Sequence, residues 1–461
     1  MADDDTRDLL ADAAARGTRY LAGLERRPVY PKAGDIDRLE QALKEPLPDS
    51  PSEPSEVLAF IDELGSPATV ASAGGRYFGF VTGGSLQASL AANWLAGAWD
   101  QNAFSFASSP AAALFEVAAL RWLKEALGLP EAAEGALVTG ATMANFTCLA
   151  AARHEVLRRA GWDAEAQGLF GAPEITVMVG EEVHASVYKV LAMLGLGRDR
   201  VVRVPADAQG RMRADRMPSI AGPTILCLQA GNVNSGAFDP AEDIIPEARA
   251  RGAWVHVDGA FGLWVRASPR LAALARGFEA ADSWATDAHK WLNVPYDCGL
   301  ALVRAPEALR RAMSISGAYL MLGARRDAID VTPDSSRRAR ALEVWAALKS
   351  LGRSGLAVMI ERNCDQAQWL AGELAKAGAE ILNEVVLNQV VAAFGDDEAT
   401  RRTVAALQDS GLAWCGGTDW QGRHAMRISV SSWATTQTDM ETTRDAILSA
   451  WRLRNANPHL Q

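Results

Sequence analysis

The sequence predicts an α/β protein with a mainly parallel, seven-stranded sheet covered by helices on both faces. Two observations support this. Seven short β-rich runs alternate, for the most part, with stretches long enough for a helix, and 49% of the 461 residues are apolar, enough to bury such a sheet. The runs are 135–139, 175–179, 201–204, 224–228, 254–257, 283–286 and 300–303. Ligands of such sheets bind beyond the carboxyl ends of the strands.

The segment before the sheet predicts a helix and a connector. Between residues 6 and 24 apolar side chains recur at helical spacing, which leaves one apolar face in need of a partner, such as a second subunit. Residues 45–56 read EPLPDSPSEPSE, and four prolines indicate a surface connector. We therefore expect an N-terminal helical, dimer-packing segment over residues 1–70.

After Gly317 the alternation stops. A long helical pattern over 338–377 precedes β-like runs at 384–393 and 425–430, which predicts a small α+β domain. The expected division is a large domain over 71–316 and a small C-terminal domain over 317–461.

Composition narrows the function. The 46 basic residues against 56 acidic ones give a net charge of −10 without a basic cluster, which disfavours nucleic acid and anionic membranes as partners. Five cysteines, without a C-x-x-C pair, predict neither a disulfide framework nor a zinc site, and no metal is expected. An acidic start and the lack of a run of about 18 apolar residues predict a cytoplasmic enzyme of small molecules.

Lys290 is the first candidate catalytic residue. It lies in SWATDAHKWLNVPYDCG, after a strand, between His289 and the bulky Trp291. Shielding from water favours the free amine, which condenses with aldehydes. The alternative is a solvated loop lysine, the usual state of lysines.

Asp258 is the second candidate catalytic residue. It lies in WVHVDGAFG, where it follows an apolar strand. A shielded carboxylate stays ionised if it meets a cation, and a protonated pyridine nitrogen would serve. The alternatives are a helix N-cap or a metal ligand.

The segment EGALVTGATMAN predicts a strand, a turn of small residues and a helix. The backbone N–H groups of Ala141 and Thr142 at the helix N-terminus suit a phosphate. A plain capping turn is the alternative. Neither a Walker lysine nor G-x-G-x-x-G is present, so a nucleotide or nicotinamide enzyme is disfavoured.

His184 follows another strand, in EEVHASVYKVLAMLG. Its imidazole could stack on a flat cofactor ring, whereas a structural hydrogen bond at a helix start is the alternative.

In this order the four segments resemble the group II pyridoxal-dependent decarboxylases, the family of the aromatic-L-amino-acid, tyrosine, histidine and glutamate decarboxylases. RYFGF at 76–80, FASSPAAALFE at 106–116 and GAFDP at 236–240 extend the resemblance over nearly the whole chain. It implies the aspartate aminotransferase-type fold of pyridoxal 5′-phosphate (PLP) enzymes.

The resemblance also implies residue roles. Lys290 would hold PLP as a Schiff base, Asp258 would pair with the pyridine nitrogen, and His184 would stack on the ring. Further cofactor contacts are implied for Ala141, Thr142, Ser283 and His289. Members are homodimers with shared active sites, so Phe80, Gly83 and Gly84 would line the substrate pocket, and Asn102 and Phe104 would approach from the other chain.

The implied reaction is decarboxylation of an L-amino acid to CO2 and an amine through a quinonoid intermediate. Three positions depart from the family. Residues 322–336 lack the tyrosine that protonates the product carbon in many members, Asn232 and Val233 replace a threonine pair, and Asn102 replaces an aliphatic residue. Alternatives are an aldehyde-forming oxidative deaminase, an aminotransferase, or a non-catalytic dimeric ligand-binding protein.

Overall fold

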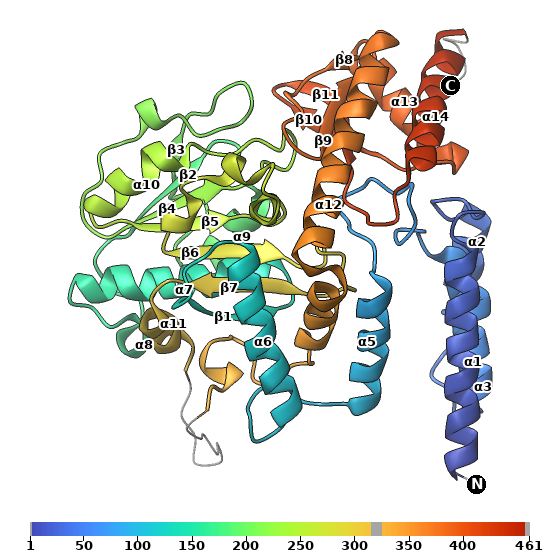
Figure 1. Cartoon of the computed structure of the whole chain (residues 1–461), viewed down its shortest axis with the longest axis horizontal. Coiled ribbons are helices and arrows are strands. Elements are labelled where there is room, and N and C mark those ends of the chain that lie inside the picture. The colour runs from blue at the N-terminus through green and yellow to red at the C-terminus, as the bar shows by residue number, and fades with distance from the viewer. Residues whose placement is uncertain (1, 315–324, 457–461) are drawn as a thin grey trace.

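Seven strands form the central sheet of the large lobe (Figure 1). In this computed structural model, which describes residues 2–314 and 325–456, their order is β1–β7–β6–β5–β4–β2–β3. Each predicted run coincides with one strand, which confirms the α/β prediction. The bounds are β1 Glu134–Val138, β2 Thr176–Gly180, β3 Val202–Val204, β4 Thr224–Gln229, β5 Trp254–Asp258, β6 Ser283–Asp287 and β7 Gly299–Val303.

The sheet is parallel except at β7. Strands β3, β2, β4, β5 and β6 pair in parallel, whereas β7 runs antiparallel to both β6 and β1. Because an antiparallel neighbour needs no crossover helix, residues 288–298 connect β6 to β7 directly. Lys290 lies in this connection, at the edge of the sheet where the parallel strands end.

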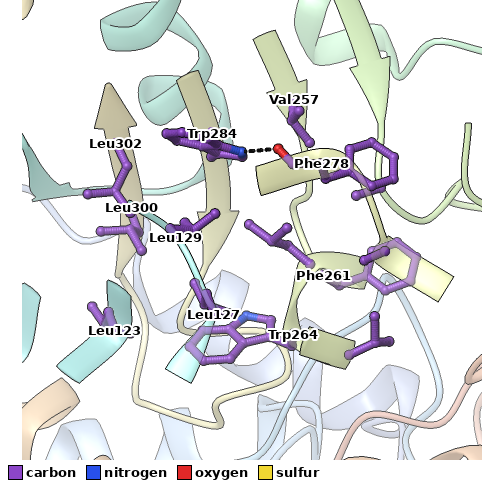
Figure 2. Packing of buried hydrophobic residues seen from close by; sticks show 14 of the residues in the cluster. Leu123, Leu127, Leu129, Val257, Phe261, Trp264, Phe278, Trp284, Leu300 and Leu302 are labelled. Atoms are coloured by element: carbon purple, nitrogen blue, oxygen red, sulfur yellow. Dashed lines mark hydrogen bonds between the residues drawn. The ribbon is translucent and has the colours of Figure 1, made fainter. Parts of the chain in front are cut away.

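Alternate side chains of the strands fill two cores. Trp284 faces one core and Ala285 the other, as the two-residue period of a strand requires. The first core packs against α6 (Pro110–Ala126), α10 (Ala241–Ala250) and the long helix α12 (Ala341–Lys376), and the second against α7 (Ala141–Arg159), α9 (Ala185–Met193) and α11 (Pro306–Met313). Figure 2 shows part of the first core, where Trp284 Nε1 donates to the carbonyl oxygen of Phe278 (2.8 Å).

The N-terminal helices stand along one edge of the molecule (Figure 1). The helix predicted over 6–24 is present as α1 (Ala2–Gly23), followed by α2 (Ala33–Ala42), α3 (Pro54–Phe60), a π turn (Ile61–Gly65) and α4 (Ser66–Ala68). The neighbouring α5 (Gln87–Trp99) brings Trp94 against Gly17 of α1. Leu10 remains 60% exposed and Trp94 45% exposed, so this edge presents apolar side chains to its surroundings.

The C-terminal lobe contains a four-stranded sheet of order β10–β11–β9–β8. Strands β9 (Gln389–Ala393) and β11 (Arg423–Ser429) match the two predicted runs, whereas β8 (Glu380–Ile381) and β10 (Gly416–Trp420) were not predicted. Helices α13 (Asp397–Ser410) and α14 (Gln437–Ala456) complete the lobe. The remaining short elements are α8 (Ala164–Gln167) and 3-10 turns at Ala214–Arg216, Gly262–Ala267, Ala272–Ala275, Phe278–Ala280 and Ala328–Asp330.

Helix α12 belongs to both lobes. It breaks at Gly352, whose φ of 59° is the left-handed conformation that favours glycine. After the break, Leu356 and Ile360 pack in the first core of the large lobe, and Leu370 and Leu374 pack in the core of the small lobe. The predicted domain boundary at 316/317 lies outside the described residues and stays a prediction.

Candidate active site

A cavity of about 350 Å³ opens where β4, β5 and β6 end and α7 and α9 begin. This size falls within the range typical of small-ligand sites, about 300–1,000 Å³. It lies at the edge of the sheet that parallel topology favours for ligands. Six of the predicted site residues line it: Ala141, Thr142, His184, Asp258, His289 and Lys290.

Lys290 is held at the cavity wall by its neighbours. Trp291 is fully buried and its Nε1 donates to Asn363 Oδ1 on α12 (3.0 Å), which fixes the turn. The Lys290 side chain is 19% exposed, and its Nζ lies 3.1 Å from Asp287 Oδ2. A shielded, positioned amine beside a carboxylate is therefore available at the cavity.

Asp287, the last residue of β6, was missed in the sequence. Its side chain is buried, and Oδ1 accepts from the backbone N–H of Ala141, the first residue of α7 (2.6 Å). This modifies the prediction that the Ala141 amide binds a phosphate, because that N–H already donates to a carboxylate. Thr142 lines the cavity at the same helix N-terminus and remains suited to an anion.

His289 packs beside this carboxylate. Its Nε2 lies 3.6 Å from Asp287 Oδ1, its Nδ1 accepts from the backbone N–H of Cys298 (3.1 Å), and its ring lies 4.4 Å from that of Tyr296. Burial, partly offset by the charge of Asp287, lowers the pKa of His289. The imidazole is thus neutral near pH 7.

Asp258 ends β5 and is 5% exposed. Its Oδ1 accepts from the backbone N–H of Ala260 (3.2 Å), and its Oδ2 accepts from Asn145 Nδ2 on α7 (3.1 Å). Both partners are neutral donors. Neither donor carries a charge that would neutralise the carboxylate, so a cationic group in the cavity can pair with it.

His184 combines a structural hydrogen bond with a position at the cavity. It is the N-cap of α9, with Nδ1 accepting from the backbone N–H of Ser186 (3.2 Å), and it also lines the cavity. Desolvation by the cavity walls lowers the pKa of His184. Because Nδ1 accepts, the neutral ring carries its proton on Nε2.

Ser283 does not reach the cavity, so the predicted cofactor contact is wrong. It begins β6, four residues before Asp287, and a strand rises about 3.3 Å per residue. Its buried hydroxyl instead bonds Trp254 Nε1 and His256 Nδ1, both at 2.9 Å. The side chain lies on the same face of the sheet as Asp287 but at the opposite end of the strand.

The predicted substrate segment lies against the Lys290 turn, although Phe80, Gly83 and Gly84 are not among the residues that line the cavity of one chain. A Cβ on Gly83 would overlap the carbonyl oxygen of Lys290. Gly84 donates its N–H to Asn293 Oδ1 (2.6 Å). Phe80 adopts a positive φ of 54° and is 64% exposed.

Asn102 and Phe104 also lie outside this cavity and are fastened to a later segment of their own chain. Asn102 Oδ1 accepts from the N–H of Arg337 (3.0 Å), and the carbonyl of Phe104 accepts from the N–H of Ile329 (2.9 Å). The loop in which a tyrosine is missing, 322–336, is therefore partly anchored here. Its first residues, 322–324, lie outside the described residues.

One departure from the family, at Asn232 and Val233, lies beside the cavity. Asn232 is 1% exposed, and its Oδ1 accepts from the N–H groups of Asn234 and Ser235, so it shapes a turn while Val233 faces the cavity. Arg427 on β11 was missed in the sequence. Its guanidinium donates a long hydrogen bond to Asn234 Oδ1 (3.4 Å), and desolvation lowers its pKa.

Comparisons with known proteins agree with this geometry. The family model described as "Pyridoxal-dependent decarboxylase conserved domain" matches residues 39–394. An L-2,4-diaminobutyrate decarboxylase of Rhizobium meliloti is 31% identical over 383 residues, covering 78% of this chain and 74% of that protein. An aromatic-L-amino-acid decarboxylase of Bacillus atrophaeus is 27% identical over 356 residues, covering 74% and 72%.

Among solved structures, Oryza sativa TDC with PLP and tryptamine aligns with a TM-score of 0.89 at 24% identity and covers 98% of both chains. At this identity the likeness shows the fold, and it agrees with the predicted architecture.

Proposed function

The chain belongs to the pyridoxal-dependent decarboxylase family and is a PLP-dependent amino-acid decarboxylase. From that premise we propose a role for each residue of its site. The observation that carries the proposal is the presence of Lys290 and Asp258 in one cavity at the ends of β6 and β5. The donor set fits the cofactor: an amine for its aldehyde, a carboxylate for its ring nitrogen, and a helix N-terminus for its phosphate.

Lys290 is assigned as the residue that binds the cofactor covalently. When bound, PLP supplies a protonated ring that accepts the electron pair of the bond being broken. Asp287 holds the Lys290 Nζ at the cavity wall (3.1 Å), and Thr142 offers its amide and hydroxyl to the phosphate. Asp258 provides the negative charge that keeps the ring nitrogen protonated.

Arg427 is assigned to the substrate carboxylate. Its partly buried guanidinium has a long hydrogen bond to an amide oxygen and no ion pair with any described residue, and its charge contributes to lowering the pKa of His184. A substrate carboxylate would satisfy this cation and hold the bond to be broken in a fixed direction. Replacing Arg427 with Lys should raise KM more than it lowers kcat.

His184 is assigned as the proton donor to the substrate carbon after CO2 leaves, because its neutral ring carries a proton on Nε2 at the cavity. His184→Asn should slow amine formation at least tenfold, and an unchanged rate would eliminate this role. Oxidative deamination, transamination and a non-catalytic role are not favoured, since the named relatives are decarboxylases.

We propose a homodimer as the functional unit. The exposed apolar edge formed by α1 and α5 suits a second subunit, and Asn102 and Phe104, which lie outside the cavity of their own chain, would complete the partner's site. Size-exclusion chromatography with light scattering tests this, and a monomer that decarboxylates at full rate would refute it.

We propose a cytoplasmic location, supported by five buried cysteines that are all free thiols. None of the described helices combines the length and apolar character needed to cross a bilayer.

The test of the function begins with absorbance. Purified protein with PLP should show a band from lysine-bound cofactor, and borohydride should fix the label on the peptide that contains Lys290. A panel of L-amino acids should release CO2 and amine in equal amounts without peroxide. Lys290→Ala should abolish both band and CO2, whereas Lys189→Ala, at an exposed position of α9, should not. Labelling of any other lysine would refute the assignment.

A further inference from the structure

A chain of buried side chains lies behind Asp258. Trp254 Nε1 bonds Ser283 Oγ (2.9 Å), which bonds His256 Nδ1 (2.9 Å), and His256 Nε2 bonds Asn145 Oδ1 (2.9 Å). Asn145 Nδ2 then donates to Asp258 Oδ2 (3.1 Å). The four side chains behind Asp258 are at most 1% exposed, so water does not compete for these bonds.

The two ends of this chain fix its direction. An indole N–H can only donate and an ionised carboxylate can only accept. Asn145 must therefore turn its NH2 toward Asp258 and its carbonyl toward His256. That carbonyl requires a proton on His256 Nε2, which leaves Nδ1 bare to accept the Ser283 hydroxyl proton. Every hydrogen bond of the chain donates toward Asp258.

The hydrogen-bonded side chains behind Asp258 carry no net charge. Complete burial lowers the pKa of His256 to about 4, so its ring is neutral at pH 7. An arginine or a protonated histidine in this place would neutralise Asp258. Neutral donors in series polarise one another and stabilise the carboxylate while leaving its negative charge available.

We propose that Trp254, Ser283, His256 and Asn145 form a one-way donor chain that holds the Asp258 carboxylate oriented toward the ring nitrogen of the cofactor. Asn145 and His256 are then positioning residues, which act through Asp258. This inference rests on the proposed function, in which Asp258 faces that nitrogen. It explains why Ser283, which does not touch the cavity, still matters for the site.

The first test compares variants by two properties of the bound cofactor: its dissociation constant, and the ¹⁵N shift of PLP labelled at the ring nitrogen. Asn145→Leu keeps the volume but removes the donor to Asp258. It should weaken PLP binding about ten- to hundredfold, the range for a lost charge-assisted hydrogen bond, and move the ring nitrogen toward its unprotonated shift.

His256→Gln and His256→Phe form a matched pair. The glutamine amide can still donate to Asn145, so PLP affinity and ring protonation should stay within threefold of wild type, whereas phenylalanine should reproduce the Asn145→Leu result. Asn383→Leu is the control for loss of a buried amide, since Asn383 Nδ2 donates to the carbonyl oxygens of Ser235 and Gln389 and takes no part in the hydrogen bonds behind Asp258. It should lower Tm and leave both cofactor properties unchanged.

If these residues had only a structural role, all buried variants would lower Tm, and PLP affinity and protonation of the ring nitrogen would stay at the wild-type values. Asn145→Leu that binds protonated PLP within twofold of wild type would overturn the proposal.

If the variants fail to fold, a measurement on the wild-type protein still tests the proposal. In the PLP-free protein, ¹⁵N NMR should show His256 with a protonated Nε2 and a bare Nδ1 from pH 5 to 8, and a protonated Nδ1 would overturn the chain. The proposed function has a separate test: the absence of a borohydride adduct on Lys290 would refute it without bearing on the His256 proton.

Discussion

Asp258 and Asp287 end neighbouring strands and face the same cavity, yet their charges are balanced in different ways. Asp258 receives one backbone N–H and one side-chain amide, both neutral. Asp287 receives the first amide of α7 and lies beside the ammonium of Lys290 and the ring of His289.

The difference assigns the two carboxylates to different tasks. The charge of Asp287 is already compensated by a cation and a helix N-terminus, so it organises the protein's own groups. The charge of Asp258 is supported without being neutralised, so it remains available to a ligand cation. Burial alone does not distinguish the two, because both are almost inaccessible; the nature of the donors does.

The largest effect should follow from removing the available charge. Asp258→Asn keeps the shape but loses the counter-charge of the ring nitrogen, and we expect kcat for CO2 release to fall about a thousandfold, as for loss of a key electrostatic group. Asp282→Asn is the control, since Asp282 is a buried carboxylate at the opposite end of β6. Equal losses in the two variants would contradict the distinction.

The neutral chain behind Asp258 should be visible as a pH dependence of stability. The folded-state pKa of His256 is about 4 and the ordinary value is 6.5, so below pH 6.5 the unfolded chain takes up a proton that the folded chain refuses. Stability present above pH 6.5 is lost as the pH falls toward 4, by about 3 kcal/mol in total.

His256→Gln should remove this dependence. Urea unfolding of PLP-free protein at pH 7 and pH 4.5 measures it, and the variant should lose less stability than wild type between the two values. Parallel losses would mean that His256 is protonated in the folded protein.

A third prediction concerns the Lys290 side. Gly83→Ala forces a Cβ into the carbonyl oxygen of Lys290, and we expect about 2 kcal/mol of lost stability together with slower formation of the cofactor absorption band. Gly372→Ala, in α12 with open space around its Cβ position, should lose nothing. A Gly83→Ala protein as stable as wild type would show that the substrate segment is not fixed to this turn.

The smallest expected effect is at Asp287. Asp287→Asn still accepts from the Ala141 amide but removes a negative charge near the phosphate end of the cavity, so PLP should bind about tenfold more tightly, or about 1.4 kcal/mol. Equilibrium dialysis of the PLP-free protein measures this. Unchanged or weaker binding would show that the negative charge of Asp287 does not oppose the phosphate.

The sequence was sufficient for the central sheet because its strands are short, buried and apolar, so each one leaves a local signal. It also located Lys290 and Asp258, which follow such strands. Strands β8 and β10 escaped, since one has two residues and the other reads GGTDW, without an apolar run.

Partners that are remote in the chain could not be predicted. Asn145 meets Asp258 only because α7 packs across β5, and Arg427 comes from the other lobe. His256 did leave a signal: it precedes Asp258 by two residues on a strand, which places both on one face. Ser283 shows the opposite error: it was expected at the cofactor, but it lies at the end of β6 that is far from the cavity.

The shared helix α12 has a consequence for how the protein can be divided. Its apolar residues after Gly352 complete one core and then the next, so a cut on either side of the helix would leave one lobe without part of its interior. We therefore expect that neither half can be expressed alone as a stable fragment, and that heating melts the two lobes in a single cooperative transition.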